Sequence, residues 1–134
     1  MLASTFPRWH GDSEPPFVLE LCRRLAKKFN IHVLAPHAPG AKSEVYSDGI
    51  SVSRYRYFFQ PWENLAYRGG ILASLKQNPC RYALIPFFLL FQTLAIYKLI
   101  HRKKFDLIHA HWIIPQGFCA VFANQLMDSC RPLI

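Results

Sequence analysis

The residues best suited to chemistry are two histidines and a tryptophan that follow a short apolar run. Leu107 and Ile108 lead directly into His109, His111 and Trp112. A short apolar run after a basic helical segment is typical of a buried strand in a parallel sheet. Ligands of open α/β sheets bind outside the carboxyl ends of the strands, where polar groups are costly unless they face a cleft or find partners. We therefore expect these side chains to form the floor of a binding site.

The spacing of the two histidines raises a metal site as an alternative. An extended strand would direct the imidazoles of His109 and His111 to the same face, as a zinc-dependent hydrolase would require. The nearest acidic residue, Asp106, lies at the start of the same strand, and no third ligand of a suitable type is close in the sequence. Polar side chains that line a cleft are much commoner than metal pairs, so we assign no metal site.

A second candidate site precedes the first predicted helix. Gly11, Asp12 and Ser13 lie where a strand turns into that helix, and backbone N–H groups at a helix N-terminus can hold a phosphate. One glycine is far from the G-x-G-x-x-G fingerprint of dinucleotide-binding folds. An ordinary turn, in which Asp12 or Ser13 caps the helix, explains the same residues. Both interpretations stay open at this point.

The elements that position these residues alternate between strands and helices. Apolar residues recur with helical spacing in some segments and form short runs or alternate with polar residues in others. We predict strands at 2–5, 31–35, 50–57 and 105–112, and helices at 15–29, 71–76, 81–104 and 118–127. This order predicts an α/β sheet with helical crossovers.

The composition favours an anionic partner for a single folded domain. Sixteen basic and eight acidic residues among 134 give a net charge of +8, and the hydrophobic fraction of 51% excludes disorder. The basic residues are dispersed and form no nucleic-acid-reading motif, so we expect no nucleic-acid partner. Cys22 and Cys119 fall on apolar helix faces, which is typical of reduced cysteine in a cytoplasmic protein, and no signal peptide is visible.

The long apolar segment 81–104 offers a different class of function. Its uncharged run ends at Tyr97 and falls short of the roughly 20 residues that a membrane-spanning helix needs. Four basic residues close the segment and are predicted to face an anionic membrane surface: Lys98, Arg102, Lys103 and Lys104. The chain would then be a membrane-surface binding module without catalysis. A core helix with a solvated basic end is the alternative.

Three stretches, taken together, resemble the N-terminal domain of family 4 glycosyltransferases, which have the GT-B fold. They carry a Phe-Pro-x-Trp-x-Gly-Asp start, an Asp-Leu-Ile-His-Ala-His-Trp strand and a final Arg-Pro-Leu-Ile. They cover residues 4–44, 48–58, and 105–118 followed by 131–134. The resemblance implies a Rossmann-like parallel sheet with helices on both faces, which is the N-terminal, acceptor-side half of a GT-B fold and is incomplete here.

The resemblance also implies a reaction. It is the retaining, metal-independent transfer of a sugar from a nucleotide-sugar donor, without a further cofactor, to a sugar, polysaccharide-precursor or lipid-linked acceptor. Such chemistry belongs to cell envelope polysaccharide biosynthesis, in the cytoplasm or peripherally at the inner face of the cell membrane. The strand end with His109, His111 and Trp112 corresponds to the acceptor side. Gly11 matches the first of a glycine pair near the donor diphosphate, and Asp12 replaces the second.

The expected catalytic histidine lies outside the sequence. In the family, the strand after Arg-Pro-Leu-Ile normally leads into a histidine-glycine motif, which here would fall beyond Ile134, and the donor-binding C-terminal domain would follow it. We therefore assign no catalytic residue. We expect residues 1–134 to be an acceptor-side domain truncated at both ends, and inactive alone.

Overall fold

The chain alternates strands and helices, as its sequence pattern predicts. The computed structural model describes residues 1–9, 11–12, 16–41, 45–46, 49–67, 69–127 and 131–134. In chain order the elements are α1 (Phe17–Ala26), β1 (Ile31–Pro36), β2 (Val45–Tyr46), β3 (Ile50–Tyr55), η1 (Gln60–Trp62), α2 (Gly70–Gln77), η2 (Pro79–Leu84), α3 (Ile85–Arg102), η3 (Ile113–Gly117) and α4 (Phe118–Gln125).

A mostly parallel sheet forms the centre of the fold. β1 pairs with β3 in parallel, with Ile31 opposite Ile50, and β2 adds to β3 in the antiparallel sense. Single parallel bridges continue the arrangement beyond β1: Leu2 with Leu34, Leu2 with Ala110, and Ile108 with Leu133. The order across the sheet is therefore β2, β3, β1, residues 1–3, residues 108–110 and residues 132–134.

Two predicted strands are less regular than their sequences indicate. The segments 2–5 and 105–112 make isolated bridges instead of complete strands. Around the bridge at Leu2, its N–H donates to the His109 carbonyl at 2.7 Å and its carbonyl accepts from the His111 N–H at 3.0 Å. The segment that carries the histidines is therefore extended, as predicted, and lies next to the start of the chain.

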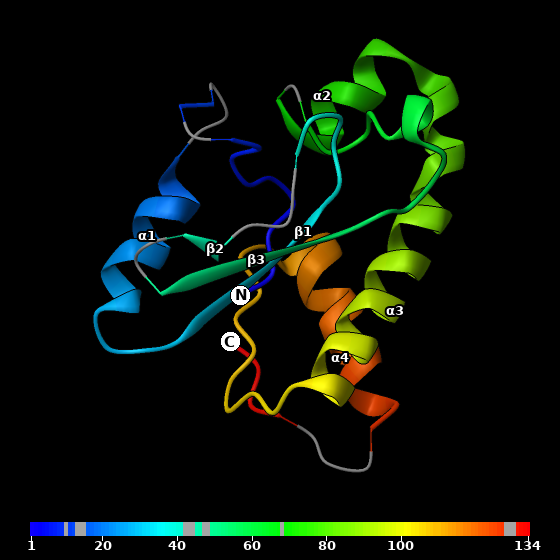
Figure 1. Cartoon of the computed structure of the whole chain (residues 1–134). Helices are drawn as coiled ribbons and strands as arrows, with labels where there is room; N and C mark the ends of the chain where they lie inside the picture. Colours follow the sequence, from blue (N-terminus) through cyan, green and yellow to red (C-terminus); the bar gives the residue numbers. More distant parts are fainter. Residues whose placement is uncertain (10, 13–15, 42–44, 47–48, 68, 128–130) are drawn as a thin grey trace.

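Helices cover both faces of the sheet and create two hydrophobic clusters. Figure 1 shows α1 on one side of the strands and α3 with α4 on the other. The alternation of side chains along β1 explains this arrangement, because Val33 belongs to the cluster under α1 and Leu34 to the cluster under α3 and α4. Cys22 and Cys119 are fully buried, one in each cluster, as predicted. The fold is an α/β, Rossmann-like arrangement.

α1 is shorter than its periodicity predicts. The prediction extended the helix to Phe29, whereas the helix ends at Ala26, followed by a turn, and Phe29 is 61% exposed. Val18, Leu19 and Cys22 are buried against the sheet. The apolar face therefore needs only the first two turns to cover β1 and β3.

Candidate functional site

The candidate site lies where the order of the sheet changes direction. From residues 1–3 the chain continues to β1 and β3 on one side, whereas residues 108–110 and 132–134 extend the sheet on the other. Ligands of open parallel sheets bind outside the carboxyl ends of the strands at such a switch point. This point lies between the loop that follows Ala3 and the residues that follow Ala110.

The three predicted acceptor residues lie together at this edge. The ring centroids of His109 and His111 are 6.3 Å apart, and those of His111 and Trp112 are 5.5 Å apart. Both histidines are half-buried, and Trp112 is 51% exposed. The tip of the segment is thus extended and open to solvent, rather than enclosed in a core, as a binding role requires.

Burial favours the neutral form of both imidazoles. Burial lowers the pKa of both His109 and His111. The positive charge of a protonated His109 lowers the pKa of His111 further. A neutral imidazole donates one hydrogen bond and accepts another, which suits a ligand rich in hydroxyl groups. Within the described residues, no group of three or more histidine, cysteine or acidic side chains is placed to hold a metal ion.

The first turn of α1 lies against this tip. The ring of Phe17 is 5.1 Å from that of His111. α1 has Pro16 at its N-cap position and no side-chain cap, so the expectation that Asp12 caps this helix is wrong. Ser13 lies outside the described residues.

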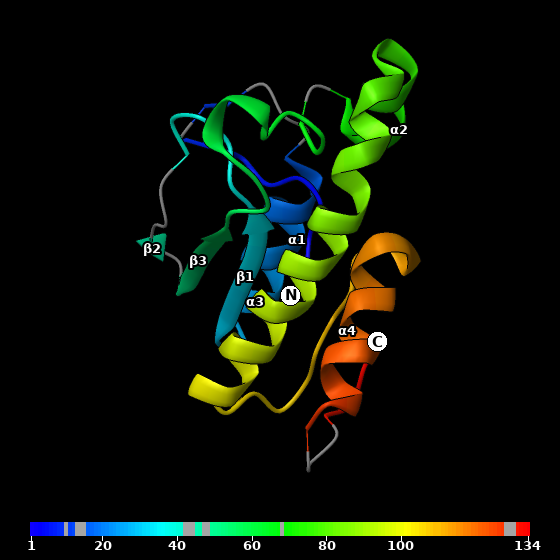
Figure 2. The same ribbon diagram turned by 90° about the vertical axis from the view of Figure 1, so that its right-hand side faces the viewer.

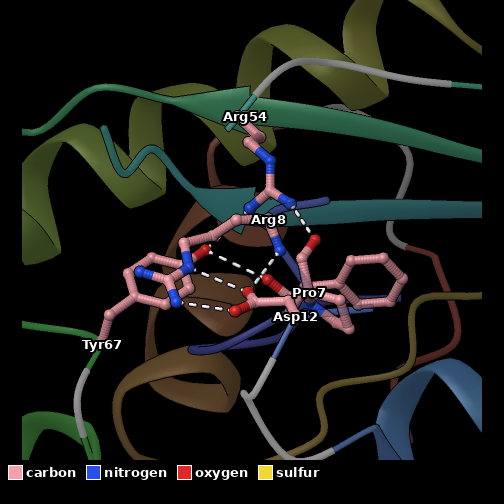
Figure 3. Close-up of polar contacts among 6 residues, drawn as sticks. Pro7, Arg8, Asp12, Arg54 and Tyr67 are labelled. Atoms are coloured by element: carbon pink, nitrogen blue, oxygen red, sulfur yellow. Dashed lines mark hydrogen bonds and ion pairs between the residues drawn. The ribbon is translucent and has the colours of Figure 1, made fainter. Parts of the chain in front are cut away.

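Asp12 instead closes the preceding loop on itself through Arg8 (Figure 3). The Arg8 Nε and Nη2 atoms donate to the two carboxylate oxygens at 2.8 and 2.7 Å, and the Arg8 backbone N–H donates at 2.8 Å. The Asp12 side chain is only 1% exposed. A free carboxylate would repel an anionic ligand, whereas this bidentate pair offsets the negative charge of Asp12.

Gly11 leaves open space beside that loop. Its φ is +80°, and a Cβ atom placed there would meet no heavy atom of the described chain within 4 Å. A pocket of about 280 Å³ adjoins it, lined by Pro7, Trp9, Gly11, Asp12, Pro16, Leu19 and Arg23. Among the described residues, those that line this pocket do not include His109, His111 or Trp112. The two predicted groups therefore share one edge of the sheet, linked through Pro16 and Phe17, but occupy separate parts of it.

Arg54 holds the same loop through hydrogen bonds, and its sequence spacing had not marked it as a site residue. Its guanidinium donates to the Pro7 carbonyl and, at 2.7 Å, to the Tyr67 hydroxyl, which in turn donates to the Pro36 carbonyl at 2.9 Å. In Figure 3, Arg54 approaches the loop from the top of the view and Tyr67 from the left. An arginine near the end of a buried strand, on the same face as two apolar residues, needs such partners, and that pattern was visible in the sequence.

The four predicted membrane-facing residues lie away from the site. Lys98, Arg102, Lys103 and Lys104 are all exposed, at or just after the C-terminal end of α3. α3 runs from the carboxyl edge of the sheet toward the opposite edge, as Figure 2 shows. These basic residues therefore belong to a different surface from the loop and the histidines.

Comparison with known proteins is consistent with this architecture. The model of Glycosyltransferase Family 4 matches residues 16–134, a range that begins after the Arg8–Asp12 loop and includes every helix and strand and the end with His109 and His111. Neither the curated proteins nor the solved structures gave a match. Because the family model matches most of the chain, the chain belongs to glycosyltransferase family 4.

Proposed function

We propose that this chain is the acceptor-side domain of an enzyme that transfers a sugar from a nucleotide-sugar donor to an acceptor. The observation that carries the proposal is the switch-point edge. There, two half-buried imidazoles and an exposed indole lie beside a loop organised by arginine, in a chain of glycosyltransferase family 4. The transfer is retaining and independent of metal, with no cofactor besides the donor.

His109, His111 and Trp112 hold the acceptor in this proposal. Neutral imidazoles hydrogen-bond to hydroxyl groups in both senses, as donor and as acceptor. The exposed indole ring offers a flat apolar surface to one face of a sugar ring. Positioning of this kind lowers the barrier to transfer by holding the reacting groups in line.

The loop at Gly11 and Asp12 receives the donor diphosphate. The open space at Gly11 lets a phosphate approach the backbone, and the Arg8–Asp12 pair removes the repulsion that a free carboxylate would cause. Charge that develops on the leaving diphosphate would be stabilised by groups already in place. Most donor contacts come from a second domain that residues 1–134 do not contain.

A matched pair of glycine variants tests the donor side. Gly11 and Gly49 have φ angles of +80° and +76°, and a Cβ atom at either would meet no heavy atom of the described residues within 4 Å. Gly11→Ala and Gly49→Ala should therefore lose similar stability, but only Gly11→Ala should weaken binding of a nucleotide-sugar panel, by about tenfold or more. Binding followed by NMR would show the difference. Equal affinity in the two variants would remove the loop from the donor site.

Titrations with oligosaccharides, also followed by NMR, test the acceptor side. His111→Ala should weaken the binding of an oligosaccharide panel, while His101→Ala, at an exposed position near the end of α3, should not. Unchanged acceptor binding in His111→Ala would remove the histidine from the site. Sugar transfer by residues 1–134 alone would contradict the assignment of the donor contacts to a second domain.

A membrane-surface binding module without catalysis is the second candidate. The exposed basic end of α3 favours it. The two functions are compatible if the acceptor is lipid-linked, as in cell envelope polysaccharide synthesis, and the protein would then be cytoplasmic and peripheral at the inner face of the membrane. Nucleotide-sugar binding separates them, because a module without catalysis would bind vesicles but no nucleotide sugar.

A further inference from the structure

A pocket of about 350 Å³ lies at the start of α3, apart from the sites described above. Its walls come from residues 58–64, from η2 with its N-cap, and from the first turn of α3. Figure 2 shows this end of α3 at the carboxyl edge of the sheet. Ligand pockets commonly range from about 300 to 1,000 Å³, so a small molecule fits this one. We call it the Trp62 pocket, after the tryptophan in its lining.

Aromatic rings form one side of the Trp62 pocket. Phe58 and Phe87 meet edge to face, with their ring centroids 5.2 Å apart. Phe87 is 42% exposed and Trp62 is 60% exposed, although both line a concave site. Aromatic rings that stay open to solvent in a pocket favour a ligand with a flat apolar face.

Planar polar side chains form the other side of the pocket. Arg81 donates from Nη1 to the Ser74 carbonyl at 3.0 Å. The Asn78 side-chain oxygen accepts from the Cys80 N–H at 3.0 Å. Asn64 Oδ1 and Arg81 Nε are buried and have no hydrogen-bond partner in the described part of the chain. Because buried polar groups normally have partners, the pocket lining holds one acceptor and one donor that are unused.

This lining favours an uncharged ligand that is rich in hydroxyl groups. A hydroxyl group both donates and accepts, so two neighbouring hydroxyls can bind the Asn64 oxygen and the Arg81 Nε–H after small side-chain rotations. A wholly apolar ligand would leave both groups unpaired. A multiply charged ligand would meet a single charged residue, Arg81, in the described lining. Sugar rings combine apolar C–H faces with hydroxyl edges, and therefore match both sides of the pocket.

We propose that the Trp62 pocket is a carbohydrate-binding site. One face of a sugar ring packs on Trp62 or Phe87, and its hydroxyl groups bind Asn64 and Arg81. The pocket follows β3, whereas His111 follows residues 108–110, which lie beyond β1 and residues 1–3 in the order of the sheet. The proposal goes beyond the transfer reaction, because a sugar held in this pocket is not the unit that reacts. It stands whether or not His111 binds the acceptor.

The three tryptophans of the chain report on different sites. Trp62 lines this pocket, Trp9 lines the pocket beside the donor loop, and Trp112 lies next to His111. In NMR titrations of the full chain with glucose, galactose, mannose and N-acetylglucosamine, at least one sugar should shift the Trp62 indole N–H signal, with a Kd of about 1 mM. The shift should persist in His111→Ala. A shift of the Trp112 signal alone would overturn this proposal and leave the proposed acceptor site intact.

A matched pair of aromatic variants tests the packing of the sugar ring. Trp62 and Tyr82 are each 60% exposed, but Tyr82 is not among the described residues that line the pocket. Trp62→Ala should weaken sugar binding by about tenfold or more, followed through the side-chain amide signal of Asn64, whereas Tyr82→Ala should bind as the wild type does. Equal affinities in the two variants would contradict the proposal.

Asn64→Leu separates sugar binding from folding. Because Asn64 Oδ1 has no described partner, this change should not lower the free energy of unfolding in urea. It should nevertheless weaken sugar binding by about tenfold, measured from the Trp62 signal. Gln77→Leu is the control, since Gln77 is exposed at the end of α2 and outside the described lining. Equal affinities in these two variants would also count against the site.

Two results with the wild type would overturn the proposal outright. One is the absence of any Trp62 shift with all four sugars. The other is a shift with uridine but with no sugar, which would assign the Trp62 pocket to a nucleobase instead. Circular dichroism would verify that each variant folds before its affinity is compared.

Discussion

Arg54 is the residue that connects the sheet to the loop of the candidate site. It lies at the end of β3, reaches past β1 and donates to the carbonyl of Pro7, while Tyr67 shares the same network. Hydrogen bonds from a charged donor are stronger than those between neutral groups. The position of the Arg8–Asp12 pair, and with it the open space at Gly11, therefore depends on a residue that would not itself touch the ligand.

Replacement of Arg54 should loosen this loop. Hydrogen bonds that involve a charged group contribute about 1.5 to 3 kcal/mol, so we expect Arg54→Met to lower the free energy of unfolding by about 2 kcal/mol. Arg56→Met, two residues along the chain and exposed, should change it by less than about 0.5 kcal/mol. Urea denaturation followed by tryptophan fluorescence measures both. Equal losses in the two variants would show that Arg54 does not anchor the loop.

His32 is a second half-buried polar residue with defined partners. Its ring nitrogens contact the hydroxyls of Ser51 and Ser53 on β3, the second at 3.0 Å. Burial lowers the pKa of His32 to about 4, and the positive charges of Lys103 and of the terminal amine act in the same direction. The imidazole is therefore neutral in the folded protein at pH values where it is already protonated in the unfolded chain.

This pKa makes the stability of the fold depend on pH. The stability that neutral His32 contributes is fully present above the ordinary histidine pKa of about 6.5. It is lost as the pH falls toward the pKa of His32 in the folded protein, because only the unfolded state takes up the proton in this range. The free energy of unfolding should thus be lower at about pH 5 than at about pH 7. His32→Gln, whose amide can still bond to both serines, should reduce this fall, leaving the part due to His109 and His111. An unchanged fall would exclude His32 as its source.

At the scale of elements, periodicity predicted most of the fold. The helical spacing of α1, the long apolar segments of α3 and α4, the apolar run of β1 and the alternation along β3 were each visible in the sequence. β1 reads as a run because it packs against a cluster on each side, whereas the apolar residues of β3 alternate with polar ones. β2 was missed because two residues carry no detectable alternation. The segments 2–5 and 105–112 were predicted as strands and are extended, but pairing beyond single bridges depends on neighbours that a local pattern does not contain.

The candidate site was predictable in its location but not in its contacts. The strand end with His109 and His111 followed from its apolar run, and the structure places it at the edge of the sheet. The pairing of Asp12 with Arg8 was not predictable, because a local turn can satisfy a carboxylate as well as a helix N-terminus can. The spacing of Arg54 on β3 shows that it needs partners, but the identity of those partners depends on distant segments that no spacing rule reveals.

At the scale of the whole molecule, the candidate site and the basic end of α3 lie toward opposite edges of the sheet. The site lies at the carboxyl edge, whereas α3 runs from that edge toward the opposite one and ends in the basic residues Lys98, Arg102, Lys103 and Lys104.

The two hydrophobic clusters should behave as one cooperative unit, because both depend on β1. Val33 and Leu34 are neighbours on this strand, are 0% and 5% exposed, and belong to the cluster under α1 and the cluster under α3 and α4, respectively. Unfolding of either cluster would expose one side of β1 to water and would loosen the strand against which the other cluster packs. A domain of this size is thus expected to unfold in one transition.

Truncation of Val33 and of Leu34 tests whether the two clusters unfold cooperatively. Leu34→Ala should lower the free energy of unfolding by about 2 to 5 kcal/mol, and Val33→Ala by less, since fewer buried atoms are removed. If the clusters are coupled, each variant shifts the whole urea transition, and amide hydrogen exchange becomes faster in both α1 and α3. Two independent units would instead give two transitions, with Val33→Ala accelerating exchange only in α1 and Leu34→Ala only in α3 and α4. The stability of the candidate site would then depend on one cluster alone.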